Sequence, residues 1–311
     1  MSEKIYQLVT DRILALLEEG VVPWKKRWRT SNGSGLPVNF VSRRPYRGVN
    51  VFLLIAQGFS TPYWLTFKQA QDRGGNVRRG ERGTPIVFWR IDQKTIDETD
   101  GEKNPAAPRI LLRYYTVFNL EQCDGIEIPG ATEGPEFDPL PACEAVYANM
   151  PNPPELRHCG ERAFYRRSDD LVQLPRPEAF SRPEHYYSTK YHELGHSTGH
   201  PSRLNRFAEE GNRGVFGSPS YAREELVAEM TAAMICGVLG IAPVKVEAIS
   251  ASGEEEILAS SAAYLQHWMD VLKADNRAVV IAAARAQKAA DYILGRQRQE
   301  HEDAREQDEA A

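Results

Sequence analysis

The sequence predicts an α+β protein of two domains, on three observations. Its 311 residues suffice for about two domains of roughly 150 residues each. Short apolar segments broken by Gly and Pro fill the first part, whereas long helical patterns fill the second. Charge divides in the same way: residues 1–90 hold 15 Lys and Arg against 6 Asp and Glu, and residues 91–311 hold 23 against 37. The net charges of +9 and −14 indicate two domains with different partners.

The first domain is expected to cover residues 1–123. It opens with an amphipathic helix over residues 3–19, where apolar side chains recur at helical spacing. Residues 84–90 and 111–118 alternate or run apolar, as strands do. The acidic stretch 91–108 between them contains Asp-Gly and Asn-Pro pairs and is predicted to be a loop.

A Pro-rich segment follows the first domain. Residues 124–155 contain seven prolines in 32 residues, which predicts a linker with room for a short helix at 141–150. The second domain is expected over residues 156–295. Residues 296–311 mix charges without an apolar pattern and are predicted to be a solvated tail.

The second domain is predicted to be mainly helical. Residues 163–174 have the pattern of a β-hairpin. The next helix starts at a capping box formed by Ser181 and Glu184, with Pro183 in its first turn. Asp275 is a candidate N-cap for the last helix. The predicted helices cover residues 181–198, 218–240, 254–273 and 276–294.

The first of these helices carries the motif His192-Glu193-Leu194-Gly195-His196. Histidines four residues apart lie on one helix face, so both imidazoles can bind one metal ion. Glu193 is then offset beside the open coordination position, where it can take a proton from a water molecule as general base. The motif therefore predicts a divalent metal site with Glu193 as its catalytic residue.

A catalytic zinc site needs a third protein ligand. The metzincin pattern would place a histidine where this chain has Ser202, so that pattern fails. His200 stands one turn after His196, but Gly199 and Pro201 should have ended the helix before it. His200 is therefore a poor candidate.

Glu225 and Glu229 on the next helix are better candidates. Their stripe of that helix is otherwise alanine and cysteine, where two carboxylates are costly without a positive partner. The pattern resembles the gluzincin arrangement, in which a glutamate on a second helix binds zinc and an acidic residue four positions later orients a ligand histidine. That resemblance makes Glu225 the ligand and Glu229 the orienting acid, and the reverse assignment stays open. Arg223 and Glu224 fit an ordinary solvated face.

Cations and aromatic residues interleave in the first domain, which contains four of the five tryptophans. Single-stranded nucleic acid is bound by cations that follow the phosphates and by rings on which bases stack. Both occur together in Trp24-Lys25-Lys26-Arg27-Trp28-Arg29 and in Arg43-Arg44-Pro45-Tyr46-Arg47. The predicted DNA-binding residues are Trp24, Lys25, Lys26, Trp28, Arg43, Arg44, Tyr46, Arg47, Trp64, Lys68, Arg78, Arg79 and Arg82.

The motifs of both domains resemble those of ArdC-type antirestriction proteins over about residues 1–295. In the first domain they are Arg44-Pro45-Tyr46-Arg47-Gly48-Val49-Asn50, Trp64-Leu65-Thr66-Phe67-Lys68-Gln69-Ala70 and Tyr115-Thr116-Val117-Phe118-Asn119. Plasmid TraC-type primases share that domain. In the second domain they are the histidine motif with its continuation Ser197-Thr198-Gly199-His200 and the run Tyr221-Ala222-Arg223-Glu224-Glu225-Leu226-Val227-Ala228-Glu229.

The resemblance implies a single-stranded-DNA-binding domain followed by a zincin-like metallopeptidase domain. It further implies a plasmid-borne protein that binds single-stranded DNA without sequence preference and protects incoming DNA from restriction during conjugation. An alternative is an active metallopeptidase that cleaves a host protein and is localised on DNA by its first domain. In that case the strand at 171–174 is expected to pair with an extended substrate.

The remaining expectations concern metal, location and partners. One divalent ion is expected, with zinc favoured because two imidazoles and a carboxylate suit it, and manganese or another divalent ion as the alternative. The sequence shows no membrane span and no secretory signal, and its four cysteines lack metal-binding or disulfide spacing. We therefore expect a cytoplasmic protein, which conjugation could carry into the recipient cell.

Overall fold

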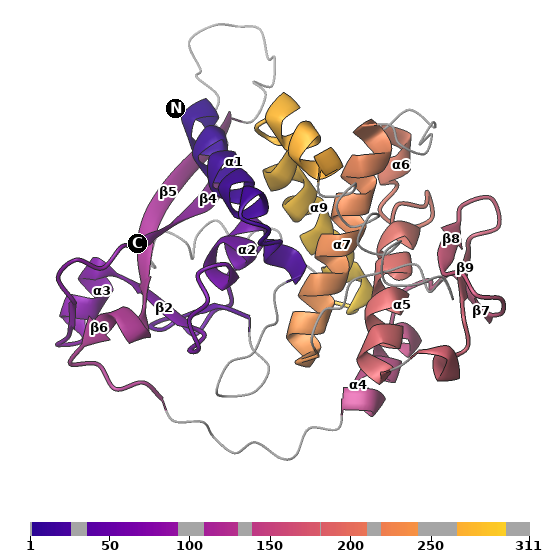
Figure 1. The fold of residues 1–311 in the computed structure, drawn as a ribbon, viewed down its shortest axis with the longest axis horizontal. Coiled ribbons are helices and arrows are strands. Elements are labelled where there is room, and N and C mark those ends of the chain that lie inside the picture. Colours follow the sequence, from indigo (N-terminus) through magenta and orange to yellow (C-terminus); the bar gives the residue numbers. More distant parts are fainter. Residues whose placement is uncertain are drawn as a thin grey trace, which may run out of the picture.

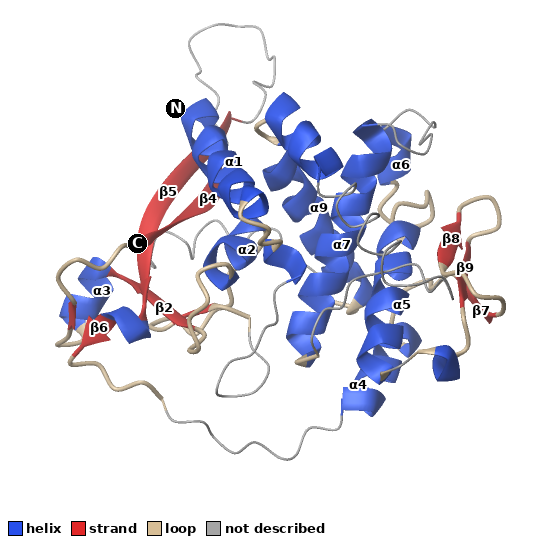
Figure 2. Cartoon of the chain, viewed as in Figure 1, coloured by secondary structure: helices blue, strands red, loops and turns tan. Residues whose placement is uncertain are grey.

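The computed structural model describes residues 2–25, 36–92, 109–129, 139–180, 182–209, 219–241 and 266–296. An N-terminal half built on a mixed sheet lies beside a mostly helical C-terminal half with a small sheet of its own (Figures 1 and 2). The predicted α+β class is therefore confirmed.

The N-terminal half is organised around a four-stranded sheet in the order β1-β2-β5-β4. Its strands are β1 (Val38–Asn39), β2 (Tyr63–Thr66), β4 (Thr84–Asp92) and β5 (Arg109–Asn119). The two strands predicted from sequence are confirmed: β4 and β5 pair antiparallel, with Thr84 opposite Val117 and Asp92 opposite Arg109. Residues 93–108 of the predicted loop lie outside the described residues.

Helices and a two-stranded ribbon complete this half. They are α1 (Ser2–Glu18), η1 (Pro23–Lys25), α2 (Val49–Ile55), α3 (Phe67–Asp72), η2 (Leu120–Gln122) and the paired strands β3 (Asn76–Val77) and β6 (Cys123–Asp124). Ile5, Val9, Ile13, Leu16 and Leu17 of α1 are buried, as their helical spacing predicts, whereas Leu8 is 41% exposed. The outer edge of β4 is covered by α2, because the Asn50 side chain bonds the backbone N–H and carbonyl of Val87 at 2.8 and 2.7 Å.

The C-terminal half contains a three-stranded sheet in the order β7-β9-β8. Its strands are β7 (Glu155–His158), β8 (Phe164–Arg166) and β9 (Leu171–Leu174). The predicted hairpin is confirmed, because β8 and β9 pair antiparallel. However, β7 pairs with the other edge of β9. The expectation that residues 171–174 pair with a substrate is therefore wrong, since both edges of that strand are taken within the protein.

The helices follow the predicted pattern with small differences at their ends. They are α4 (Pro139–Ala148), η3 (Pro177–Ala179), α5 (Pro183–Ser197), α6 (Arg206–Glu209), α7 (Pro219–Leu239), residues 266–274 and α9 (Ala278–Ile293). The N-cap of α5 is Arg182 rather than Ser181, because the helix begins at Pro183, and the N-cap of α9 is Arg277 rather than Asp275. Residues 254–265 and 297–311 lie outside the described residues. No helix in the described part of the chain is long and apolar enough to cross a membrane.

Part of the segment predicted as a linker belongs to the C-terminal half. Cys143 and Val146 of α4, together with Met150 after it, are buried in the same core as α5 and α7. Glu155 already pairs within the sheet as the first residue of β7. The prolines of this segment delimit a packed helix, so their number alone does not define a flexible connection.

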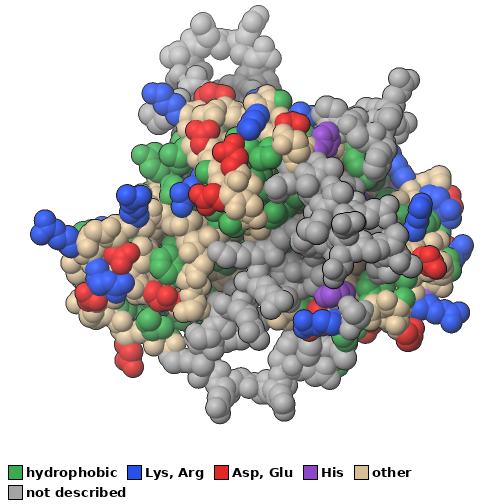
Figure 3. Space-filling model, viewed as in Figure 1, with side chains coloured by type: hydrophobic (Ala, Val, Ile, Leu, Met, Phe, Trp, Pro, Cys, Tyr) green, Lys and Arg blue, Asp and Glu red, His purple; other side chains and the backbone are tan. Residues whose placement is uncertain are grey.

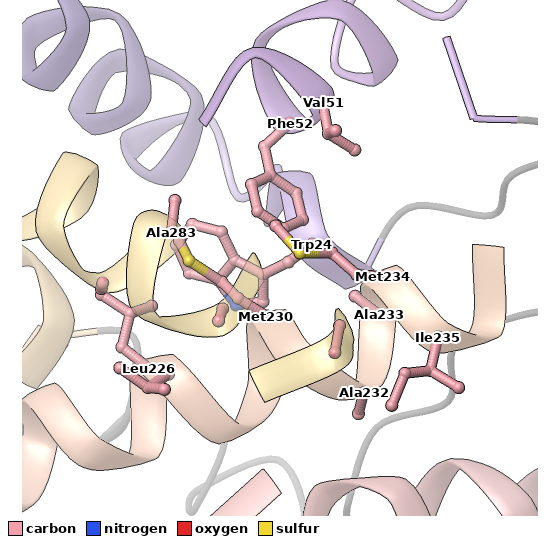
Figure 4. Close-up of a cluster of buried hydrophobic side chains, with 14 of the residues drawn as sticks. Trp24, Val51, Phe52, Leu226, Met230, Ala232, Ala233, Met234, Ile235 and Ala283 are labelled. Atoms are coloured by element: carbon pink, nitrogen blue, oxygen red, sulfur yellow. The ribbon is translucent and has the colours of Figure 1, made fainter. Parts of the chain in front are cut away.

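The largest hydrophobic core joins the two halves. It contains buried residues of α1, η1 and α2 together with residues of α4, α5, α7 and α9. Trp24 lies within it at 1% exposure, and its ring packs edge-on against Phe52 at 6.2 Å and Trp268 at 5.5 Å between centroids. In Figure 4, Met230 and Met234 of α7 and Ala283 of α9 surround the same indole. The two halves therefore share one hydrophobic core.

Polar contacts reinforce this contact between the halves. Arg47 pairs with Asp291 of α9 at 2.5 Å, and the backbone N–H of Gly48 donates to Gln287 at 3.1 Å. The Thr10 hydroxyl of α1 donates to the carbonyl of Asn276 at 2.7 Å.

Candidate metal centre and nucleic-acid interface

Close packing of α5 against α7 brings the histidine motif to Glu225. A Cβ atom on Gly195 would lie 3.2 Å from the Cα of Ala228, which is tighter than most packed side chains allow. The absence of a side chain at Gly195 therefore lets the two backbones approach closely. His192 and His196 flank this point on α5, and Glu225 precedes Ala228 by one turn on α7.

The three side chains converge on one point. His192 Nε2 lies 3.1 Å from His196 Nε2, and each of these nitrogens lies 3.5 Å from an oxygen of Glu225. Ligands about 2.0–2.2 Å from a tetrahedral zinc ion are separated by roughly 3.3–3.6 Å, so these spacings are close to those around a single ion. Among the described residues, the group that could hold a metal comprises these three, and Glu229 is not part of it. We therefore propose His192, His196 and Glu225 as the metal ligands.

Electrostatics also favour a cation at this point. Burial opposes protonation of His192, but the hydrogen bond to Glu225 and the charges of Glu193, Glu225 and Glu229 outweigh it and raise the pKa of His192 to about 9. Burial would raise the pKa of Glu225, yet the His196 charge and the His192 hydrogen bond lower it to about 2. The carboxylate thus needs a positive partner, and a divalent ion can take the place of the imidazole protons.

Glu193 lies beside the metal ligands at 5% exposure. Its burial raises the pKa of its carboxyl group, which the charges of His192 and His196 oppose. The backbone N–H of Tyr165, on the edge strand β8, donates a hydrogen bond to this carboxylate. A buried carboxylate with a raised pKa next to a metal site has the properties of a general base.

Glu224, which the sequence assigned to a solvated face, orients His196. It is 8% exposed, and its Oε1 lies 3.2 Å from His196 Nδ1. The buried Arg206 donates hydrogen bonds to both oxygens of the same carboxylate, at 2.6 and 3.0 Å. It also donates to the carbonyl of Gly195 at 2.7 Å. Such a partner sets the direction in which a ligand imidazole points.

Glu224 thus orients His196, and the orienting role predicted for Glu229 stays a prediction. Glu229 acts on His192 through its charge, whereas Glu224 makes the hydrogen bond to His196. Neighbouring helix positions are about 100° apart, so Glu224 and Glu225 can both reach α5 where the helices cross. The two adjacent glutamates are visible in the sequence, but their separate roles follow only from the way α7 is oriented against α5. His200 bonds Ser202 Oγ at 2.7 Å and is not in the metal-holding group.

Burial excludes three of the predicted DNA-stacking residues. Trp24, Trp64 and Tyr46 are 1%, 2% and 7% exposed, so none presents a ring face to a base. Trp24 is part of the core between the halves, whereas Trp64 and Tyr46 share a separate core cluster with Ile86 on one face of the sheet. These three aromatic residues serve packing.

The predicted cations divide into two groups. Arg47 is paired with Asp291, and Arg78 is paired with Glu81 at 2.9 Å. Trp28, Lys26 and the side chain of Lys25 lie outside the described residues. Exposed side chains are found at Arg43, Arg44, Lys68, Arg79 and Arg82. Apart from the paired Arg78, these five are the predicted cations whose described side chains are exposed.

Substitution of the proposed ligands should remove the metal. His192→Ala and Glu225→Gln should each weaken metal binding by more than 100-fold, because each removes a ligand atom, whereas Glu224→Gln should cost roughly 10- to 100-fold as the loss of an outer partner. Glu229→Gln should bind metal like the wild type. Metal content after dialysis and chelator competition measure these differences. If Glu229→Gln lost its metal and Glu225→Gln retained it, Glu229 rather than Glu225 would be the third ligand.

Comparisons with known proteins match both halves. Residues 3–118 match the N-terminal domain of anti-restriction factor ArdC, and residues 142–285 match a zincin-like metallopeptidase. The chain is 36% identical to the uncharacterized protein y4eC of Sinorhizobium fredii, over 94% of this chain and 92% of that protein. It is also 36% identical to a DNA primase TraC of Escherichia coli over 94% of this chain, but spans only 27% of the primase.

Solved structures extend the similarity to the whole fold. The metal-free antirestriction protein ArdC from plasmid R388 is 35% identical, with a TM-score of 0.73, over 94% of this chain and 99% of that one. The Mn(II)-bound structure of the same protein gives a TM-score of 0.70, with 35% identity over 94% of this chain and 97% of that one. The chain therefore belongs to the family of ArdC-type antirestriction proteins, with an ArdC-type N-terminal domain followed by a zincin-like metallopeptidase domain.

Proposed function

We propose that the protein protects incoming plasmid DNA from restriction during conjugation by binding it as single strands with little sequence preference. The observation that carries this proposal is the whole-length similarity to ArdC from R388, an antirestriction protein. Protection by coating requires a DNA-binding surface, and we assign it to the N-terminal half. We expect the protein to act in the cytoplasm.

The charge distribution supports this assignment. Residues 1–90 carry a net charge of +9, and residues 91–311 carry −14, so phosphates are attracted to the first region and repelled by the second. Arg43 is the best-positioned cation, because its guanidinium lies 4.7 Å from the centre of the Phe40 ring and 4.9 Å from that of Tyr63. Ring contacts of this kind hold the exposed cation in place.

Removal of exposed cations should weaken DNA binding and its salt dependence together. For a chain with Arg43→Ala, Arg44→Ala and Lys68→Ala, the slope of log K against log salt should fall by about 0.7 for each phosphate that is no longer neutralised, or about 2 in total. Fluorescence anisotropy with a labelled oligothymidine at several salt concentrations measures both quantities. Lys288→Ala removes an exposed charge from α9 and should change neither. An unchanged affinity in the triple variant would show that these cations are not part of the interface.

A second function, peptide hydrolysis, is favoured by Glu193 beside the proposed ligands. A divalent ion held by His192, His196 and Glu225 would polarise a peptide carbonyl and lower the pKa of water. Glu193 would accept the proton of the attacking water and later return it to the leaving amine. The substrate would be a host protein, with the N-terminal half keeping the enzyme on DNA.

An extended substrate has a place to bind next to Glu193. Strand β8 lies at an edge of its sheet, and its Tyr165 N–H contacts the Glu193 carboxylate. A peptide that adds to this edge would have its backbone beside the proposed base. We propose zinc as the metal, with manganese as the alternative because the R388 protein has a Mn(II)-bound structure. Elemental analysis of the purified protein distinguishes the two.

A further inference from the structure

The exposed aromatic side chains of the N-terminal half are not the ones that its motifs suggested. Tyr114 on β5 is 56% exposed, and Phe67 at the start of α3 is 46% exposed. Among the described large hydrophobic side chains, these two are the exposed aromatic ones. Figure 3 shows hydrophobic side chains at the surface of this half, with Lys and Arg side chains among them.

Both rings lie on one face of the sheet. Alternation along β5 places Tyr114, Thr116 and Phe118 on the same side, about 14 Å from first to last. The Phe67 ring packs edge-on against Phe118 at 6.5 Å between centroids, so Phe67 extends the row. We call these four residues the aromatic strip. A side chain at Gly83 would collide with Thr116 and Phe118, so the lack of one keeps the strip open.

Cations border the aromatic strip. Lys68 follows Phe67 in the chain, Arg82 precedes Gly83, and both are exposed. Arg43 lies over Tyr63, which shares this face with Leu65, and Leu65 is paired with Phe118. The nearby Glu81 is engaged by Arg78 at 2.9 Å and by Gln122 at 3.0 Å, which offsets its charge. Rings and cations thus occur on one surface.

Single-stranded DNA is the occupant that this combination suits. An apolar protein partner would bury the bordering cations, which is costly without matching carboxylates. A single strand presents unpaired bases to the rings and phosphates to the cations, and every base has a face that can stack. We propose that the aromatic strip is the base-stacking platform of the protein, an inference that rests on the DNA binding proposed above.

The test uses the full chain and a labelled oligothymidine in fluorescence anisotropy. Stacking on one ring is worth about 5- to 150-fold in affinity, so Tyr114→Ala should bind at least 5-fold more weakly. Phe67→Ala should show a reduction in the same range, whereas Tyr114→Phe should bind like the wild type because it keeps the ring. Ile281→Ala, which removes an exposed apolar side chain from α9, should have no effect.

An abasic strand of the same length separates stacking from charge. The wild type should prefer the thymine-bearing strand, and Tyr114→Ala should lose most of that preference with an unchanged salt slope, because every phosphate-neutralising cation is still present. If the wild type binds both strands equally, or Tyr114→Ala binds thymines like the wild type, the strip is not the platform, although DNA binding itself stands.

Two further outcomes would overturn the inference. A wild type that binds neither strand would contradict both the strip and the proposed DNA binding. A wild-type dimer in size-exclusion chromatography that Tyr114→Ala converts to monomers, with DNA affinity unchanged, would identify the strip as a self-association surface.

Discussion

The Glu193→Gln variant should bind metal and single-stranded DNA like the wild type but lose peptide hydrolysis by about 10²- to 10⁴-fold. Glutamine keeps the size of the side chain and an oxygen that can accept the Tyr165 N–H, so the buried position is preserved. It cannot accept the proton of an attacking water. The comparison requires turnover of a broad peptide library by both proteins, with and without chelator.

The same variant separates the two functions in cells. If protection depends on coating DNA, Glu193→Gln should protect a conjugating plasmid from restriction as well as the wild type does. Glu178→Gln, an exposed change on η3, is the matched control. Loss of protection with intact metal and DNA binding would instead make proteolysis of a host factor the leading function. A metal-loaded wild type that cuts no peptide would contradict the hydrolytic function.

Trp24→Ala should lower the free energy of unfolding by about 3–5 kcal/mol. Its indole is 1% exposed in the core with residues of α2 and α7 and with Trp268, so truncation leaves a cavity in the core that joins the halves. Because both halves share this core, circular dichroism and the intrinsic fluorescence should report a single transition in urea at a lower midpoint. The expected destabilisation is equivalent to a change of more than 100-fold in the unfolding equilibrium.

A matched aromatic substitution provides the control. Tyr114→Ala removes an exposed ring from the same half and should change the free energy of unfolding by no more than about 0.5 kcal/mol. Trp24→Ala should therefore lower the stability, and Tyr114→Ala should lower the DNA affinity. A Trp24→Ala protein with normal stability and weakened DNA binding would restore Trp24 as a stacking residue.

Local sequence patterns determined the elements and the chemistry of the histidine motif. The helical spacing of α1 and the strands β4 and β5 are periodic signals within short segments, and the structure contains each of them. The spacing of His192 and His196 depends only on the geometry of one helix, so the sequence alone predicted that they share a face. Each of these inferences needs information from a single continuous segment.

Tertiary packing decided which residues meet. Glu224 lies 28 residues from His196 in the chain and reaches it only because α7 crosses α5 at Gly195, and Arg206 of α6 binds the same carboxylate. Trp24 and Trp64 lie in segments whose composition is typical of a DNA-binding motif, but parts of the chain distant in sequence bury their rings. The ring of Tyr114 is exposed. Burial depends on partners contributed by the whole chain, and a local pattern records the kind of side chain without recording what packs against it. The structure therefore moved the candidate stacking surface from Trp24 and Trp64 to β5, and it identified Glu224 as the hydrogen-bond partner of His196.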